Sequence, residues 1–404
     1  VLALADSATR LHDLNGGMIL PGLMDSHSHP VGAATFEFDH PIPDIADIPQ
    51  LLDYITVRTK AIPEGSLIYI RQVFITRLKE QRYPTRAELD AVAPKHPVHF
   101  STGPDSMLNS LALELAGIGP DFTLPAGSSG RVERDAKGEL TGLVRGFSPK
   151  IKAPSTTKSP TPEQTLDLVK RLFTDCNRVG YTTLADRGSN PTNLAIYQQL
   201  RDSGSLTLRL RASHTFTIGN LWPAVEKAID DIAAHPLCKG DDMLKIVGTK
   251  VWLDGGMLTG SALMQQPWGV SEMYGIIDPE YRGVQNIPRE PLKRAVEKVS
   301  SLGLQFTAHA VGDGATQLLV DIYEELSPAI RDTRPCITHC NFMAPDTIAK
   351  AAKLGVVIDL QPIWFHLDGR TLLKQFGMER IDIAHIDVRC PVRADRRRAR
   401  IELR

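Results

Sequence analysis

Four times along this chain, a helical pattern of apolar residues ends at a glycine and continues directly into a β-rich segment. A glycine just beyond a helix readily adopts the left-handed backbone conformation that other residues resist. The glycines are Gly180, Gly204, Gly303 and Gly355, and the strands expected after them cover residues 181–185, 206–210, 304–309 and 356–360. Repeated units of helix, glycine and strand predict parallel strands joined by crossover helices, and therefore an α/β fold.

The first of these helices has the most complete start signal. Thr161 suits the N-cap position, Pro162 suits the first helical position, and Gln164 completes a capping box. Apolar residues then recur at helical spacing as far as Cys176. The other three helices are expected near residues 193–203, 292–302 and 345–354.

The pair His27 and His29 is the strongest indication of chemistry. Residues two apart on a strand point to the same face, so two such imidazoles can hold one metal ion. An apolar run from Met18 leads into the pair and Pro30 ends it. This pattern is typical of a buried parallel strand that delivers ligands at its carboxyl end.

His309 and His339 also lie where an expected parallel strand meets its loop, the second of them at the end of the segment 336–339. In a barrel of parallel strands these ends form the active face. A single histidine at such a place is more often a structural residue than a ligand. Three such positions on separate strand units favour metal binding.

Lys250 lies within the apolar segment 244–256, where a charged amine is costly and its pKa falls. A neutral amine can add carbon dioxide to form a carbamate, whose two oxygens could bridge two metal ions. The alternative is an ordinary ammonium group that pairs with Asp254 or reaches solvent.

Two other patterns are weaker. Cys336 and Cys340 bracket a histidine, but a structural zinc site usually needs a second pair of ligands, and none lies nearby. Ser26 and Ser28 lack the Gly-x-Ser-x-Gly turn that presents a nucleophilic serine.

Composition excludes several classes of protein. The 404 residues carry a net charge of −1, which gives no sign of nucleic-acid or anionic-membrane binding. No apolar run is long enough for a membrane span. Five scattered cysteines and no visible signal peptide favour the cytoplasm, although an upstream start could have carried a signal. We expect a small-molecule substrate, no nucleic-acid or membrane partner, and leave a homo-oligomer open.

The chain divides into four expected segments. Residues 1–31 hold a remnant of an N-terminal β segment and the first barrel strand, and 161–388 hold the remaining barrel. The Pro- and Gly-rich residues 32–160 form an insertion, with a hairpin expected at 130–142. Residues 389–404 contain seven arginines without apolar periodicity, and we interpret them as a non-native tail rather than a basic arm.

Taken together, these residues resemble the amidohydrolase superfamily, and in particular the YtcJ-like metal-dependent hydrolases, which include N-substituted formamide deformylases. The similarity covers most of residues 15–380. The matching segments are 20–29, 84–94, 109–113, 250–255, 308–313 and 338–340.

The resemblance implies a (β/α)8 barrel of the TIM type, with an insertion after its first strand. It implies one or two divalent metal ions, zinc by preference, and a carboxylated Lys250. The implied ligands are His27, His29, Lys250, His309 and His339. The implied reaction is hydrolysis of a non-peptide carbon–nitrogen bond, in an amide or formamide, by metal-activated water.

The chain also departs from this family. The family's last strand carries an aspartate in a Gly-Ser-Asp type segment, and no such segment occurs here; Asp382 and Asp387 are nearby carboxylates outside any matching motif. We therefore expect a barrel truncated at both ends and leave the catalytic acid unassigned. The alternatives are a catalytically inactive barrel that only binds metal or ligand, and a phosphoesterase, which the segments around Lys250 and His309 disfavour.

Overall fold

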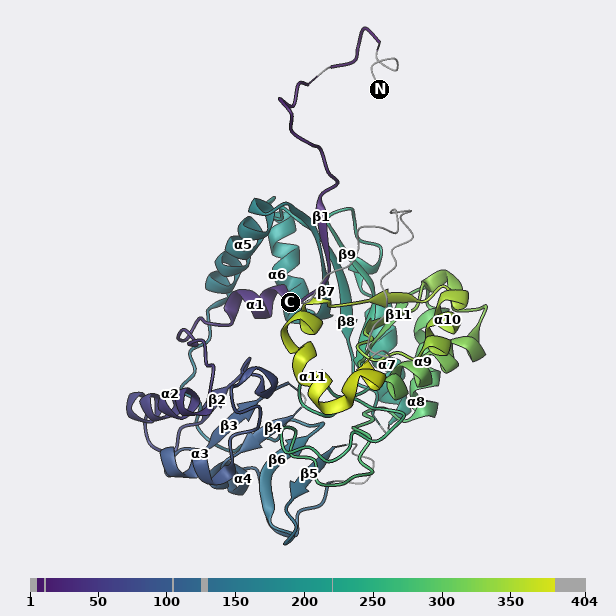
Figure 1. Ribbon diagram of the computed structural model, residues 1–404. Helices are drawn as coiled ribbons and strands as arrows, with labels where there is room; N and C mark the ends of the chain where they lie inside the picture. The colour runs from purple at the N-terminus through teal and green to yellow at the C-terminus, as the bar shows by residue number, and fades with distance from the viewer. Residues whose placement is uncertain (1–5, 11, 104, 125–129, 220, 382–404) are drawn as a thin grey trace.

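A computed structural model describes residues 6–10, 12–103, 105–124, 130–219 and 221–381 (Figure 1). Its main sheet has seven strands in the order β1-β7-β8-β9-β10-β11-β12, and every neighbouring pair is parallel. The strands are β1 (Leu23–Ser28), β7 (Tyr181–Ser189), β8 (Arg209–Thr215), β9 (Leu244–Trp252), β10 (Gln305–Ala310), β11 (Cys336–His339) and β12 (Val357–Asp359). The sheet curves into a nearly closed barrel, so that its two outermost strands approach each other: Ser26 of β1 donates a 2.6 Å hydrogen bond to Asp359 of β12.

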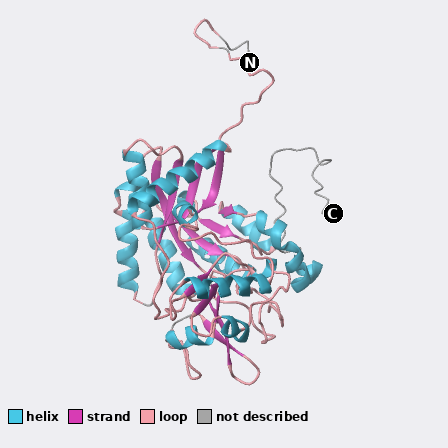
Figure 2. Cartoon of the chain, turned by 90° about the vertical axis from the view of Figure 1, so that its left-hand side faces the viewer, coloured by secondary structure: helices cyan, strands magenta, loops and turns pink. Residues whose placement is uncertain are grey.

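Helices alternate with these strands and cover the outer side of the sheet (Figure 2). They are α1 (Pro30–Thr35), α5 (Pro162–Arg178), α6 (Pro191–Asp202), α7 (Trp222–Ala233), α8 (Arg289–Ser301), α9 (Asp313–Leu326) and α10 (Pro345–Leu354), with short 3-10 helices at Pro236–Cys238 and Arg331–Thr333. The last helix, α11 (Ile363–Ile381), follows β12 and lies over the carboxyl ends of the strands. The expected α/β barrel architecture is therefore confirmed. Among the helices in the described ranges, none is long and apolar enough to cross a membrane.

Local signals located most boundaries correctly. The capping box at Thr161 and Gln164 is present, and Gly355 ends α10 with a φ of 73°. One strand was misplaced: the segment expected at 206–210 pairs only from Arg209 onward, as far as Thr215. Leu206 is instead held to the end of α6 through a hydrogen bond from its backbone N–H to Leu200. Its apolar side chain had suggested a strand, and that side chain is buried in the main apolar core.

A second sheet of five strands lies between β1 and β7 in the sequence, at the bottom of Figure 1. Its order is β2 (Ile68–Ile70), β3 (Val98–Ser101), β4 (Ser106–Leu108), β6 (Leu140–Arg145) and β5 (Arg131–Arg134). The antiparallel pairing of β5 with β6 confirms the expected hairpin. This sheet is accompanied by α2 (Ile48–Ala61), α3 (Arg86–Val92), α4 (Ser110–Leu115) and a 3-10 helix at Ile75–Arg77.

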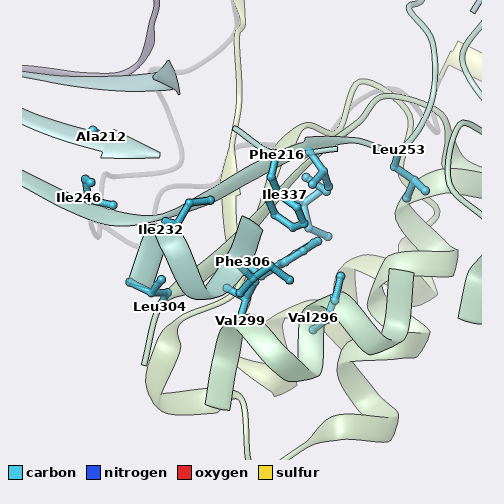
Figure 3. Packing of buried hydrophobic residues seen from close by; sticks show 14 of the residues in the cluster. Ala212, Phe216, Ile232, Ile246, Leu253, Val296, Val299, Leu304, Phe306 and Ile337 are labelled. Carbon is cyan, nitrogen blue, oxygen red and sulfur yellow. The ribbon is translucent and has the colours of Figure 1, made fainter. Parts of the chain in front are cut away.

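The main apolar core lies between the barrel strands and their helices (Figure 3). Phe306 of β10 and Val299 of α8 are fully buried there, as are Val296 and Ile337. Burying each such side chain stabilises the fold by about 1.5–3 kcal/mol. The carboxyl ends of the strands are consequently held on a rigid frame.

Buried polar contacts join the second sheet to the barrel. Arg145 of β6 is fully buried; it donates hydrogen bonds to Glu133 (2.6 Å) and to the backbone oxygen of Thr259 (2.9 Å) in the long segment after β9. On the other side, Asp368 of α11 accepts hydrogen bonds from Thr76 and Arg77. These contacts hold the second sheet and α11 over the carboxyl ends of the barrel strands.

Candidate active site

A cavity of about 700 Å³ lies where the barrel, the second sheet and α11 meet. All five residues expected from the sequence to bind metal line it. Other lining residues come from three parts of the molecule. The barrel adds Trp252 and Gln361, and α11 adds Ile363, Trp364 and Leu367. The second sheet and its loops add Tyr69, Arg71, Gln72, Phe74, Arg77, Ser101, Thr102 and Gly103. Residues more than 300 positions apart in the chain therefore line the same cavity.

The histidine rings form a continuous group. The ring centroids lie 5.3 Å apart for His27 and His29, 4.7 Å apart for His27 and His339, and 4.6 Å apart for His309 and His339. Two imidazoles that share a tetrahedral zinc ion with Zn–N bonds of 2.0–2.1 Å have centroids about 5 Å apart. The spacing of the rings therefore suits shared ligation.

Three of these histidines have one ring nitrogen held by an oxygen acceptor. His27 Nδ1 lies 3.1 Å from Asp359 Oδ2, and His309 Nε2 lies 3.0 Å from the backbone oxygen of Gly255. His339 Nδ1 lies 2.5 Å from Gln361 Oε1. Because a carboxylate or carbonyl oxygen can only accept, each of these nitrogens donates, which leaves the other nitrogen of the same ring with a lone pair.

Burial keeps these rings neutral. Burial lowers the pKa of His309 to about 3 and lowers the pKa of His339 well below its ordinary value. The pKa of His27 is also lowered by burial, against the opposing effect of its hydrogen bond to Asp359. Neutral imidazoles are the form that binds metal.

His29 differs from the other three because its side chain is 55% exposed. Its Nδ1 lies 3.7 Å from Asp186, a buried carboxylate of β7. A Cβ atom at the neighbouring Gly188 would come within 2.6 Å of the same Nδ1. The absence of a side chain at Gly188 therefore makes room for the His29 ring.

Lys250 is buried on β9, and its amine donates a hydrogen bond to Thr338 of β11. Burial lowers the pKa of Lys250 to about 7, so a substantial fraction of the amine is neutral near neutral pH. In the described structure the Lys250 amine bonds to Thr338 rather than to Asp254. Asp254 instead accepts backbone N–H groups of residues 263, 311 and 312.

The donor set fits a divalent cation in its chemistry: the buried rings of His27, His309 and His339 are neutral and each keeps a lone pair, and the amine of Lys250 is partly neutral. Within the described ranges, no three His, Cys, Asp or Glu side chains already converge on a single point.

Sequence reasoning missed the residues that support the ligands. Asp359 and Gln361 follow one another closely at the end of β12 and contact His27 and His339. Trp364 of α11 stacks on His339 with centroids 4.9 Å apart. An acidic residue inside the expected strand 356–360 was the available signal, because a carboxylate in a buried strand needs a partner.

The remaining candidates have structural partners or lie elsewhere. Ser26 donates to Asp359, and Ser28 donates to the backbone oxygen of Ala185. Cys336 and Cys340 are buried free thiols. Asp382, Asp387 and the arginine-rich residues 389–404 lie outside the described residues.

Comparison with known proteins identifies the family. The model of the amidohydrolase family matches residues 10–388. The chain belongs to the amidohydrolase family. It is 24% identical over 383 residues to YtcJ of Bacillus subtilis (strain 168), covering 92% of this chain and 67% of that protein. It is 23% identical over 360 residues to the N-substituted formamide deformylase of Arthrobacter pascens, covering 87% of this chain and 64% of that enzyme.

Solved structures share the fold. An uncharacterized metal-dependent hydrolase from Pyrococcus horikoshii OT3 aligns with a TM-score of 0.55 at 22% identity, covering 92% of this chain and 70% of that one. A second, from Pyrococcus furiosus, aligns with a TM-score of 0.52 at 19% identity, covering 90% and 69%. This amidohydrolase chain spans about two thirds of the length of YtcJ and of the deformylase.

Proposed function

We propose that this amidohydrolase is a metal-dependent hydrolase that cleaves a non-peptide carbon–nitrogen bond in a small amide or formamide. The observation that carries the proposal is the meeting of His27, His29, Lys250, His309 and His339 in one cavity, from four different regions of the chain. The names of the relatives agree with it, since one is an N-substituted formamide deformylase. The fold neighbours from Pyrococcus are described as metal-dependent hydrolases.

The four histidines and Lys250 would hold one or two divalent ions, and zinc is the ion we propose because imidazole nitrogen is among its preferred ligands. When bound, such an ion supplies Lewis-acid activation of water and of the carbonyl group. The barrel contributes preorganisation: His309 and His339 are held by Gly255 and Gln361 before any ligand arrives.

We further propose that Lys250 is carboxylated in the metal-loaded protein. The neutral amine nitrogen attacks the carbon of carbon dioxide, a nitrogen–carbon bond forms, and one proton leaves the nitrogen for solvent. The product is an anionic carbamate with two oxygen donors. Burial supports this step, because it keeps part of the Lys250 amine neutral and nucleophilic.

The rim of the cavity supports a small, largely apolar substrate. Four large apolar side chains on it are exposed: Tyr69, Trp252, Ile363 and Leu367. Exposed apolar groups gathered around a cavity indicate ligand binding. Because the chain has a net charge of −1, we propose that it has no nucleic-acid or membrane partner. We also propose a cytoplasmic location, which the free thiols of the described cysteines favour.

Metal content and substrate turnover test the proposal together. Purified protein should contain divalent metal by elemental analysis and should release amine from at least one member of a panel of N-formyl and N-acyl compounds. A double variant, His27→Ala with His29→Ala, should lose both properties. The control is His12→Ala, at an exposed position that does not line the cavity. Equal metal content in the double variant and the control would refute the proposal.

A further inference from the structure

Strand β12 contributes no residue to the expected ligand set, yet its end is polar and connected to two ligands. Asp359 is buried, with only 1% of its side chain exposed, and does not line the cavity. Its Oδ2 lies 3.1 Å from His27 Nδ1, and its Oδ1 accepts hydrogen bonds from Ser26 (2.6 Å) and from Gln361 Nε2 (3.3 Å). Asp359 therefore cannot meet substrate directly and can act only through its partners.

Gln361 continues the chain of contacts. Its Nε2 donates to Asp359, so its Oε1 is directed the other way, where it accepts from His339 Nδ1 at 2.5 Å. The result is a continuous series from His27 through Asp359 and Gln361 to His339. It joins the first strand of the sheet to the sixth through the seventh.

The barrel geometry explains how these side chains meet. Inward-facing side chains of alternate barrel strands share a layer. β1 and β12 are the first and seventh strands of the sheet, so their inward side chains reach the same level inside the barrel. The contact therefore connects the two edge strands of the sheet inside the barrel.

Resting on the proposed function, we propose that Asp359 and Gln361 are positioning residues that fix His27 and His339 in the Nδ1–H form. Each ring then presents its Nε2 lone pair for a metal ion. Outer groups that orient metal-ligating histidines in this way set ring direction and ligand basicity, and their loss typically weakens metal binding by about 10- to 100-fold.

A structural role is the competing explanation, because the buried Arg187 has its Nε 3.5 Å from Asp359 Oδ2. Two variants separate the roles. Asp359→Ala removes both the charge and the acceptor, whereas Asp359→Asn removes the charge but keeps an oxygen that can accept from His27. Positioning predicts that the Asn variant recovers much of the zinc affinity. Charge balance with Arg187 predicts that both variants are equally impaired.

The experiment uses the full chain with two readouts. Nitrogen-15 NMR of histidine-labelled, metal-free protein, assigned with His27→Ala and His339→Ala, reports the tautomer of each ring. Zinc affinity is measured by competition with a chromophoric chelator. We expect Asp359→Ala to lose the Nδ1–H form of His27 and to bind zinc about 10- to 100-fold more weakly. Gln361→Ala should do the same to His339 alone.

Ser26→Ala is the matched control, because it removes one donor to Asp359 while both histidine nitrogens keep their acceptors. It should leave both tautomers and the zinc affinity unchanged. An unchanged His27 tautomer in Asp359→Ala would overturn the inference, as would equal weakening by the Ala and Asn variants. Wild-type protein that binds no zinc would contradict the proposed function instead, and the tautomers of the metal-free protein would still decide the inference.

Discussion

Substituting Gly188 by alanine should weaken metal binding without destabilising the fold. The new Cβ would lie 2.6 Å from His29 Nδ1 and 2.9 Å from its Cε1, where ordinary van der Waals contact begins at 3.4 Å. The ring must therefore retreat by about 0.8 Å, the difference between 3.4 and 2.6 Å. Because His29 is 55% exposed, solvent leaves it space to move.

The size of the effect follows from this displacement. In catalysis, misplacing a group by about 1 Å can cost about 10²-fold in rate. We expect zinc affinity to fall by about 10- to 100-fold, in the range seen when ligand orientation is lost. The midpoint of thermal unfolding of the metal-free protein should stay close to that of wild type, since no core side chain moves.

Gly32→Ala supplies the control for this prediction. Gly32 lies within α1, just after His29, and a Cβ there meets no heavy atom within 4 Å. Alanine inside a helix should stabilise the metal-free protein by up to about 1 kcal/mol and leave zinc affinity unchanged. Equal zinc affinity in the two glycine variants would show that the position of the His29 ring does not matter for binding.

Three further predictions concern stability. Arg145→Met leaves Asp105 buried without its cation and should reduce the free energy of unfolding by about 3–5 kcal/mol in urea; a loss below about 1 kcal/mol would contradict the buried pair. Hydrogen bonds from Arg82 lower the pKa of Glu88 from 4.5 to about 2. The ionised Glu88 therefore stabilises the folded protein fully above pH 4.5, and this stabilisation is lost as the pH falls toward 2. Glu88→Gln should thus cost about 1 kcal/mol at pH 7, and a constant cost down to pH 3 would disprove the assignment. Phe306→Ala, at a fully buried position, should cost about 3–5 kcal/mol by the same measurement, and a cost under about 1 kcal/mol would show that the core collapses around it.

The fold was largely predictable because its signals are local. The capping box at Thr161 and the left-handed Gly355 each depend on only a few neighbouring residues, and each marks a helix boundary. Strand limits depend on partners elsewhere in the chain. The strand expected at 206–210 begins at Arg209 because pairing with β7 begins there.

The site was predictable only in part. His27, His29, Lys250, His309 and His339 could be found because each follows or occupies an apolar strand. Asp359 and Gln361 could not be assigned a role, because the contact between His27 and Asp359 joins residues 332 positions apart. Such a pairing depends on closure of the barrel, and no short sequence motif predicts which distant residues closure brings together.

That same contact bears on how the chain folds. Closing a loop of 332 residues costs conformational entropy that earlier, local contacts do not, so we expect the seam between β1 and β12 to form last. The second sheet and the successive helix–strand units can assemble before it. Metal binding by His27 together with His339 would then report completion of the barrel, and a nascent chain that has not yet reached residue 361 would have the histidines without the means to orient them.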